Sequence, residues 1–278
     1  MDTITAPAPP KTLMQKTYWA ARDCRTIVVQ ELTHHVKQPG LFAWQLGFPV
    51  VMVLLFVYVF GSAMDVTGEG AGEGYLEFAI PGLLAMTMAF GFMNTAAAVA
   101  FAKEKGFTDR FRSMPMAPSA FVTGRGVADI IHASADLIIL VLIALALGWR
   151  PDTLTGALTA MAVLLWLRFA LIWVGVWIGL LVKNVEAANS LFALAFPVAM
   201  ISSVFTPPSM MPSWLGTIAA WNPVSAAAST ARDLFGSPAV TGNSWIENNA
   251  AAASIIWPII LTAIFLPLAV GRWKALSR

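Results

Sequence analysis

Apolar residues gather in six long runs along the chain, and shorter polar segments separate them. The runs cover residues 41–60, 78–101, 127–147, 158–182, 187–205 and 250–270. A helix that crosses the roughly 30 Å hydrocarbon core of a bilayer needs about 20 mostly apolar residues. The pattern therefore predicts an all-α, polytopic membrane protein with six transmembrane helices, of which the fifth is short.

The segment 206–223 is apolar but carries several residues that break helices. These are Pro207, Pro208, Pro212, Gly216 and Pro223. Non-helical backbone at membrane depth is tolerated only where protein or a water-filled cavity surrounds it. We therefore expect a re-entrant or surface-lying element between helices 5 and 6.

Residues 13–38 lack a run long enough to span a membrane. Their less polar positions recur every three to four residues from Leu13 to Val36, with Arg22, Arg25 and Lys37 elsewhere around the helix. This spacing predicts an amphipathic helix in the cytoplasmic interface, which the basic content favours over the alternative, a helix packed on a soluble partner. The chain then divides into an N-terminal part, 1–40, and a transmembrane domain, 41–278.

Basic residues are distributed unevenly among the segments between the runs. Fourteen of the 17 lysines and arginines precede the first run, lie between the second and third, follow the fourth, or end the chain. The segment between the first and second runs carries four acidic residues and no basic one. Because basic loops stay in the cytoplasm, we expect both termini to be cytoplasmic.

The composition agrees with lipid as the main solvent. Hydrophobic residues make up 58% of the chain and charged residues 12%, against roughly 25% charged in soluble domains, and the mean hydropathy is +0.72. A net charge of +2 gives no reason to expect nucleic acid as a partner, and the single cysteine, Cys24, excludes an internal disulfide.

Motifs for catalysis are missing from the sequence. It contains no G-x-x-x-x-G-K-[ST] loop for nucleotide phosphates, no H-E-x-x-H zinc motif and no G-x-S-x-G serine elbow. The adjacent His34 and His35 point to different faces of a helix. We therefore expect no catalytic residue, no metal site and no cofactor in this chain.

Ionisable residues inside apolar runs are expensive and mark sites of interest. The third run holds Asp129, His132 and Asp136 on one helical face, and the fourth holds Arg168. Asp136 and Arg168 are expected at similar depth, so an ion pair between them is the interpretation we favour. The alternative is a proton or substrate pathway along these groups.

The fourth run has two distinct faces. Trp166, Trp173 and Trp177 share one side, and Arg168 lies opposite with Gly175 and Gly179. A G-x-x-x-G spacing lets another helix approach closely, so Arg168 is expected to face a packed neighbour. The tryptophans would face lipid, a subunit interface or a hydrophobic substrate.

The segment 102–119 combines alternating charges with two terminating prolines. Its pattern includes Glu104, Gly106, Asp109, Arg110, Phe111, Arg112, Ser113 and Pro115, followed by Gly124, Arg125 and Asp129. It resembles the cytoplasmic coupling segment of type-2 ATP-binding-cassette (ABC) permeases. A second match follows the fifth run at Phe196-Pro197, Ser202-Ser203, Phe205, Pro208, Met211-Pro212, Trp214-Leu215, Asn222-Pro223 and Arg232.

The resemblance, which looks strongest to the daunorubicin-resistance type, implies an exporter permease in a bacterial cell membrane. Such permeases pair with a second permease chain, identical or paralogous, and with a separate cytoplasmic ATPase that holds ATP and magnesium. By position, Glu104, Asp109, Arg110 and Arg112 would make polar contacts with the ATPase, and Phe111 an apolar one. Ser113 and Pro115 complete the coupling segment.

The resemblance also implies where a substrate passes. The segment 206–223 would form part of an outer gate, and the substrate would be an amphipathic drug or lipid-like molecule. Candidate path or gate residues are Trp166, Trp173, Trp177, Phe205, Pro208, Met211 and Asn222. Two alternatives remain open: export of a polysaccharide or glycolipid by the same architecture, and an ion-gradient-driven carrier that uses the buried charged groups.

Overall fold

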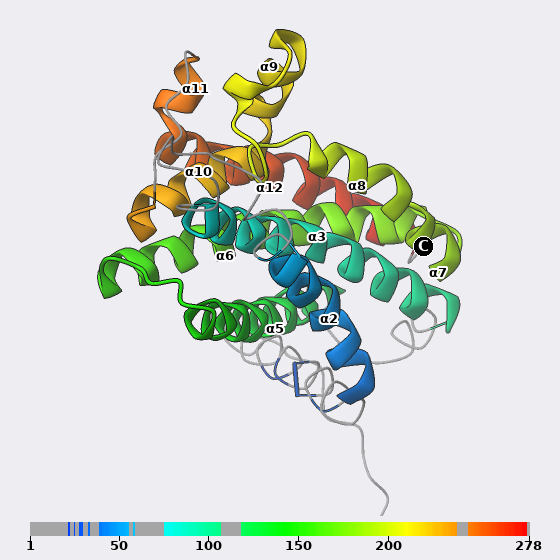
Figure 1. The fold of residues 1–278 in the computed structure, drawn as a ribbon. Coiled ribbons are helices and arrows are strands. Elements are labelled where there is room, and N and C mark those ends of the chain that lie inside the picture. The colour runs from blue at the N-terminus through cyan, green and yellow to red at the C-terminus, as the bar shows by residue number, and fades with distance from the viewer. Residues whose placement is uncertain are drawn as a thin grey trace, which may run out of the picture.

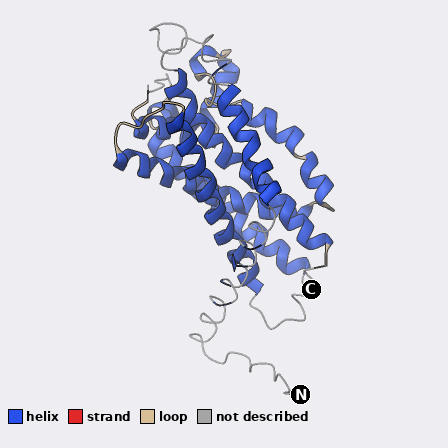
Figure 2. Cartoon of the chain, turned by 60° about the horizontal axis from the view of Figure 1, so that its bottom comes forward, coloured by secondary structure: helices blue, strands red, loops and turns tan. Residues whose placement is uncertain are grey.

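A computed structural model describes residues 39–55, 75–106, 118–237 and 244–276, together with single residues 22, 25, 28, 29, 33 and 58. All regular structure in this part of the chain is helical (Figures 1 and 2). The elements are α2 (Pro39–Leu55), α3 (Tyr75–Glu104), α5 (Pro118–Ala146), α6 (Leu154–Leu181), α7 (Val185–Ser190), α8 (Phe192–Met200), η2 (Pro208–Met210), α9 (Ser213–Trp221), α10 (Pro223–Phe235), α11 (Trp245–Asn248) and α12 (Ala250–Leu276). The prediction of an all-α fold is confirmed for the described residues.

Four of the described helices are long and apolar enough to cross a membrane. The stretches concerned are Leu76–Glu104, Gly124–Ala146, Leu154–Leu181 and Ala250–Ala275, which correspond to the second, third, fourth and sixth predicted runs. The first run overlaps α2, and the fifth is divided between α7 and α8. The predicted total of six therefore stays a prediction, as does the amphipathic helix at 13–38, most of which lies outside the described residues.

Contacts between helices establish their relative directions. Gly91 and Gly175 link α3 to α6, where an added Cβ on Gly91 would meet Arg168 and one on Gly175 would meet the Phe92 carbonyl. Residue numbers therefore increase in the same direction along both helices, so α3 and α6 are parallel. The same holds for α6 and α12, because Trp166 Nε1 donates to the Ile255 carbonyl (3.4 Å) and Trp177 packs on Phe265 (5.3 Å).

Helix α5 runs opposite to this parallel group. Its residue Gly126 faces Ile172 of α6, and the later residue Asp129 meets the earlier Arg168. The alternation of α3, α5 and α6 agrees with three consecutive spans joined by loops at opposite ends.

Helix α3 lies at the centre of the bundle. About two thirds (67%) of its apolar window is buried, against 33% for α5 and 22% for α12. Its buried side chains join those of α5, α6 and α10 in one core, which includes Phe78, Leu84, Leu137, Leu164 and Phe235. The outer faces of α5 and α12 instead expose isoleucine and leucine side chains, as lipid-facing helices do.

The broken segment α7–α8 runs antiparallel along α3. Val185 N donates to Glu104 Oε2 (3.4 Å), Phe196 stacks on Phe90 with ring centroids 5.9 Å apart, and the Val204 carbonyl lies beside Gly82. The segment 185–204 thus accompanies residues 82–104 of α3, a helical length of about 33 Å at 1.5 Å per residue.

The predicted irregular segment 206–223 contains two short helices with a proline at each entry. Pro208 begins η2, and Pro212 immediately precedes α9. Both α9 and α11 project from the body of the molecule (Figure 1). The backbone breaks follow the prolines as expected; whether the segment enters the membrane stays a prediction.

Helix α10 follows this segment and was not predicted as a separate element. It contacts α3, α6 and α12, and the side chains it buries are mostly small: Ser225, Ala226, Ala227, Ala228, Thr230 and Ala231. Asn222 caps its N-terminus by accepting from Val224 N (2.9 Å), and Pro223 takes the first helical position, where a missing N–H costs nothing. Gly236 ends it with a positive φ of 82°.

Candidate functional site

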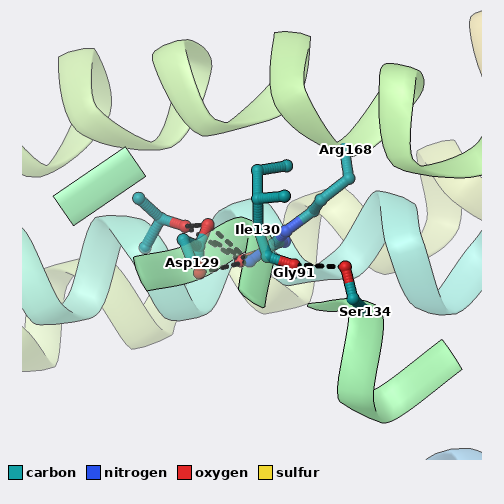
Figure 3. Close-up of polar contacts among 6 residues, drawn as sticks. Gly91, Asp129, Ile130, Ser134 and Arg168 are labelled. Carbon is teal, nitrogen blue, oxygen red and sulfur yellow. Dashed lines mark hydrogen bonds and ion pairs between the residues drawn. The ribbon is translucent and has the colours of Figure 1, made fainter. Parts of the chain in front are cut away.

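The centre of the bundle holds an ion pair between α5 and α6 (Figure 3). Arg168 Nη2 lies 2.7 Å from each carboxylate oxygen of Asp129. Thr95 of α3 completes the cluster, since its hydroxyl donates to Asp129 Oδ2 (2.8 Å) and accepts from Arg168 Nη2 (3.5 Å). The Arg168 side chain is only 5% exposed and the Asp129 side chain 15%, so three helices share one buried polar contact.

Gly91 leaves the room that the Arg168 side chain occupies. A Cβ built on Gly91 would lie 1.4 Å from Arg168 Nη1, which no real pair of atoms tolerates. The predicted close approach through Gly175 and Gly179 is confirmed, and its partner is α3: added Cβ atoms there would meet the Phe92 and Ala96 carbonyls at 2.4 and 2.6 Å. Arg168 therefore faces a packed helix, as expected.

The predicted pairing of Asp136 with Arg168 is wrong, because the partner of Arg168 is Asp129. The error came from the start of the third span, which the apolar run put at residue 127, whereas α5 begins at Pro118. Asp129 thus lies 11 residues into α5, and Arg168 lies 13 residues before the end of α6 at Leu181. At 1.5 Å per residue the two are at depths of about 17 and 20 Å, against about 27 Å for Asp136.

Asp136 and His132 lie further along α5 on the same face as Asp129. The Asp136 side chain is buried (7% exposed) and that of His132 partly so. These two residues are thus separate from the Arg168 contact, and a role in a pathway stays a prediction.

The tryptophan face of α6 packs against α12 of the same chain, so the prediction that it faces lipid, a subunit interface or a substrate is wrong for Trp173. Trp173 is 6% exposed and belongs to a cluster with Ala269 and Trp273, while Trp166 reaches the surface at 36% exposed. The Trp173 indole nitrogen and the Thr262 hydroxyl are buried and have no hydrogen-bond partner among the described residues. The contacting pairs Trp166–Ile255 and Trp177–Phe265 differ by 89 and 88 positions in the sequence. The same difference pairs Trp173 with Thr262.

Arg232 of α10 anchors a second polar contact that the sequence analysis did not assign to the interior. Its side chain is fully buried; Nε donates to the Phe78 carbonyl (2.9 Å), and Nη2 donates to the carbonyls of Ser203 (2.8 Å) and Val204 (2.9 Å). The guanidinium also lies 3.8 Å from the centroid of the Phe78 ring. The signal available in the sequence was a lone arginine in a segment of small residues.

The candidate gate residues lie around the break between α8 and α10. Phe205 and Pro208 are buried and Met211 is partly exposed. Asn222 donates to the Ile201 carbonyl (2.9 Å) while capping α10, so it fixes the end of α8 against the start of α10. These residues therefore share one region of the fold.

The candidate coupling residues lie mostly outside the described part of the chain. Asp109, Arg110, Phe111, Arg112, Ser113 and Pro115 are among the residues that the structure does not describe. Glu104 is exposed at the end of α3 and accepts from Val185 N, and Gly106 has a positive φ of 67°, which favours glycine.

Comparisons with known proteins agree on one family. Residues 22–235 match the model of the ABC-2 type transporter. A daunorubicin resistance ABC transporter permease protein, DrrB1 of Streptomyces coeruleorubidus, is 29% identical over 228 residues, which cover 81% of this chain and 77% of that protein. A putative transport permease, ycf38 of Cyanophora paradoxa, is 23% identical over 233 residues, covering 80% and 78%. The chain therefore belongs to the ABC-2 type transporter family, as a permease.

Proposed function

We propose that this chain is the transmembrane permease subunit of an ABC exporter that moves a hydrophobic or amphipathic, drug-like or lipid-like molecule out of the cell. The observation that carries the proposal is the family match over residues 22–235, joined to similarity with a drug-resistance permease over most of both chains. A separate ATPase would supply the energy and hold ATP and magnesium.

The proposal includes six membrane crossings, with both termini in the cytoplasm of a bacterial cell. The segment α7–α8 supports a fifth crossing, because it follows α3 antiparallel for about 33 Å, close to the thickness of the hydrocarbon core. With α3 and α6 parallel, α5 opposite and α12 parallel to α6, a return through α7–α8 gives an even number of crossings.

The coupling segment 102–119 would dock on the ATPase. Asp109, Arg110 and Arg112 would supply polar contacts and Phe111 an apolar one. ATP binding would then favour one conformation of the assembly over another, which shifts its population without chemistry in the permease. A second permease chain, identical or paralogous, would complete the transport path.

The substrate would pass beside Trp166, the tryptophan of α6 that reaches the surface, and the break between α8 and α10. A mostly apolar lining suits an amphipathic molecule, because it need not strip charge from the solute. Polysaccharide or glycolipid export remains the alternative within this architecture.

A carrier driven by an ion gradient is the alternative from another class. The charge of Arg168 is matched by Asp129 inside a packed core, which supports a structural role for that pair. Asp136 and His132 would then carry the alternative. Asp136→Asn should abolish transport with intact assembly if protons drive it, and should mainly lower stability if ATP does.

The decisive experiment purifies the tagged chain in mild detergent from its native membrane, followed by mass spectrometry and an ATPase assay. We expect a stoichiometric soluble subunit with a phosphate-binding loop, and hydrolysis that is absent from the permease alone. A chain that emerges without an ATPase under conditions that retain other membrane complexes would overturn the proposal.

A further inference from the structure

The end of α3 holds the end of α6 through one lysine. Lys103 Nζ donates to the carbonyl oxygens of Leu180 (3.1 Å) and Val182 (2.6 Å). These carbonyls belong to the last turn of α6 and its cap, where backbone acceptors lack intrahelical partners. A cation on such acceptors makes charge-assisted hydrogen bonds, which are stronger than neutral ones.

The next residue of α3 holds the beginning of α7. Glu104 Oε2 accepts from Val185 N (3.4 Å), the first residue of α7. The turn between α6 and α7 is only three residues long, from Val182 to Asn184. Lys103 and Glu104 therefore contact both sides of one short turn, the cation on its carbonyl side and the anion on its N–H side.

The position of these two residues in the chain is the second observation. They are the last residues of α3, and Gly106 breaks the backbone just after them with its positive φ. On their C-terminal side begins the rest of the segment 102–119. On their other side the turn leads into α7–α8, which follows α3 as far as Val204 and the Arg232 contact.

We propose that Lys103 and Glu104 are positioning residues that transmit movement of the coupling segment to the α6–α7 turn, and through it to α7–α8. The inference rests on the proposed function, since it needs an ATPase that moves the coupling segment. It gives Glu104 a role within its own chain, because its Oε2 accepts from Val185 N. The segment α7–α8 can respond because it is already divided at Leu191 and carries Pro197.

The test compares variants in the complex purified with its ATPase. Lys103→Met removes both hydrogen bonds of the lysine, and Lys103→Arg keeps a cation with several donors. Glu104→Gln removes the negative charge but leaves an amide oxygen that can accept from Val185 N. Lys183→Met is the matched control, because it removes the same charge from the same turn while its side chain is exposed. Three quantities are measured: bound ATPase, transport of the probe daunorubicin per ATP hydrolysed after reconstitution into liposomes, and deuterium uptake of residues 183–200 with and without magnesium-ATP.

We expect Lys103→Met to retain the ATPase and its hydrolysis while transport per ATP falls about tenfold, the effect of a coupling free energy in the usual range. The nucleotide-dependent change in deuterium uptake at 183–200 should disappear, with Lys103→Arg partly restoring it and Lys183→Met leaving it intact. Glu104→Gln should show a smaller loss, because the amide oxygen of glutamine can still accept the hydrogen bond from Val185 N and only the charge is removed.

Several outcomes would overturn the inference. One is that Lys103→Met keeps the wild-type change in deuterium uptake at 183–200 when magnesium-ATP is added. Another is that deuterium uptake at 183–200 does not change with nucleotide in the wild-type complex. Loss of the ATPase from the Lys103→Met complex would assign Lys103 to docking instead. Failure of the proposed function would look different, since the wild-type chain would then carry no ATPase at all.

Discussion

Arg168, Asp129 and Thr95 lie on three different helices, and one hydrogen-bonded cluster joins them. Two charges removed from water lose their hydration, and their attraction offsets that loss only in good geometry. The 2.7 Å contacts and the added hydroxyl meet that condition at Nη2, whereas Nε and Nη1 of Arg168 are buried without a hydrogen-bond partner among the described residues. Losing one partner is therefore worse than losing both, because a single substitution leaves a buried charge without its counter-ion.

This asymmetry gives a prediction for the pair. Arg168→Met or Asp129→Leu alone should each lower the free energy of unfolding by about 3 kcal/mol, while the double variant should lose clearly less than the sum. Reversible unfolding in a denaturing-detergent titration measures all three. Lys183→Met, an exposed control, should stay within about 0.5 kcal/mol. Strictly additive losses would show that the two side chains do not stabilise each other.

At the scale of elements, α10 depends on small side chains. Ala228 and Ala231 are fully buried where α10 contacts α3, α6 and α12. Gly82, Gly156 and Gly236 serve the same close packing, since Cβ atoms there would meet Arg232, the Leu234 carbonyl and Asp152 within 3 Å. Helix α10 therefore packs closely against the backbone of its neighbours, and its buried positions leave no room for larger side chains.

A larger side chain at Ala228 should accordingly destabilise the fold. Overpacking a close-packed core costs about 1–3 kcal/mol, so Ala228→Leu should lower the midpoint of thermal unfolding in detergent by several degrees. Ala251→Leu makes the same change at an exposed position of α12 and should leave the midpoint unchanged. Equal midpoints for the two variants would mean that α10 is not packed as described.

The same contrast explains what the sequence could predict. A helix that spans a membrane must present apolar side chains to lipid and therefore contains a long apolar run. Hydropathy alone thus predicts α3, α5, α6 and α12. Helix α10 was not predicted, because its alanine and serine side chains bury little apolar area. The wrong partner for Arg168 was predicted because the third apolar run begins only at residue 127. The first turns of α5 contain Gly124 and Arg125, which are typical of a loop. The residue spacing predicted the close approach of a helix at Gly175 and Gly179, but only the structure identifies that helix as α3.

At the scale of the whole molecule, the crossing by α7–α8 is the open point of the topology. In a Cys24→Ser background, Ser209→Cys should react with a membrane-impermeant maleimide added outside cells, because the segment 206–223 is expected at the outer surface. Lys183→Cys, in the turn before α7, should react only after permeabilisation. Both positions are exposed, so accessibility alone does not separate them, and labelling of both from one side would exclude a crossing between them.

The shared direction of α3, α6 and α12 has an electrical consequence. Each helix carries a macrodipole that leaves about half a negative elementary charge at its C-terminus, and here three such ends gather on one side of the bundle. Lys103 and Lys274 lie in the last turns of α3 and α12, and Lys183 just follows α6. At the opposite ends, Glu77 lies in the first turn of α3, and Asp152 and Glu247 just precede α6 and α12. The lysines on which the predicted orientation rests therefore also neutralise the helix ends. Replacing one of them should alter the field across the bundle.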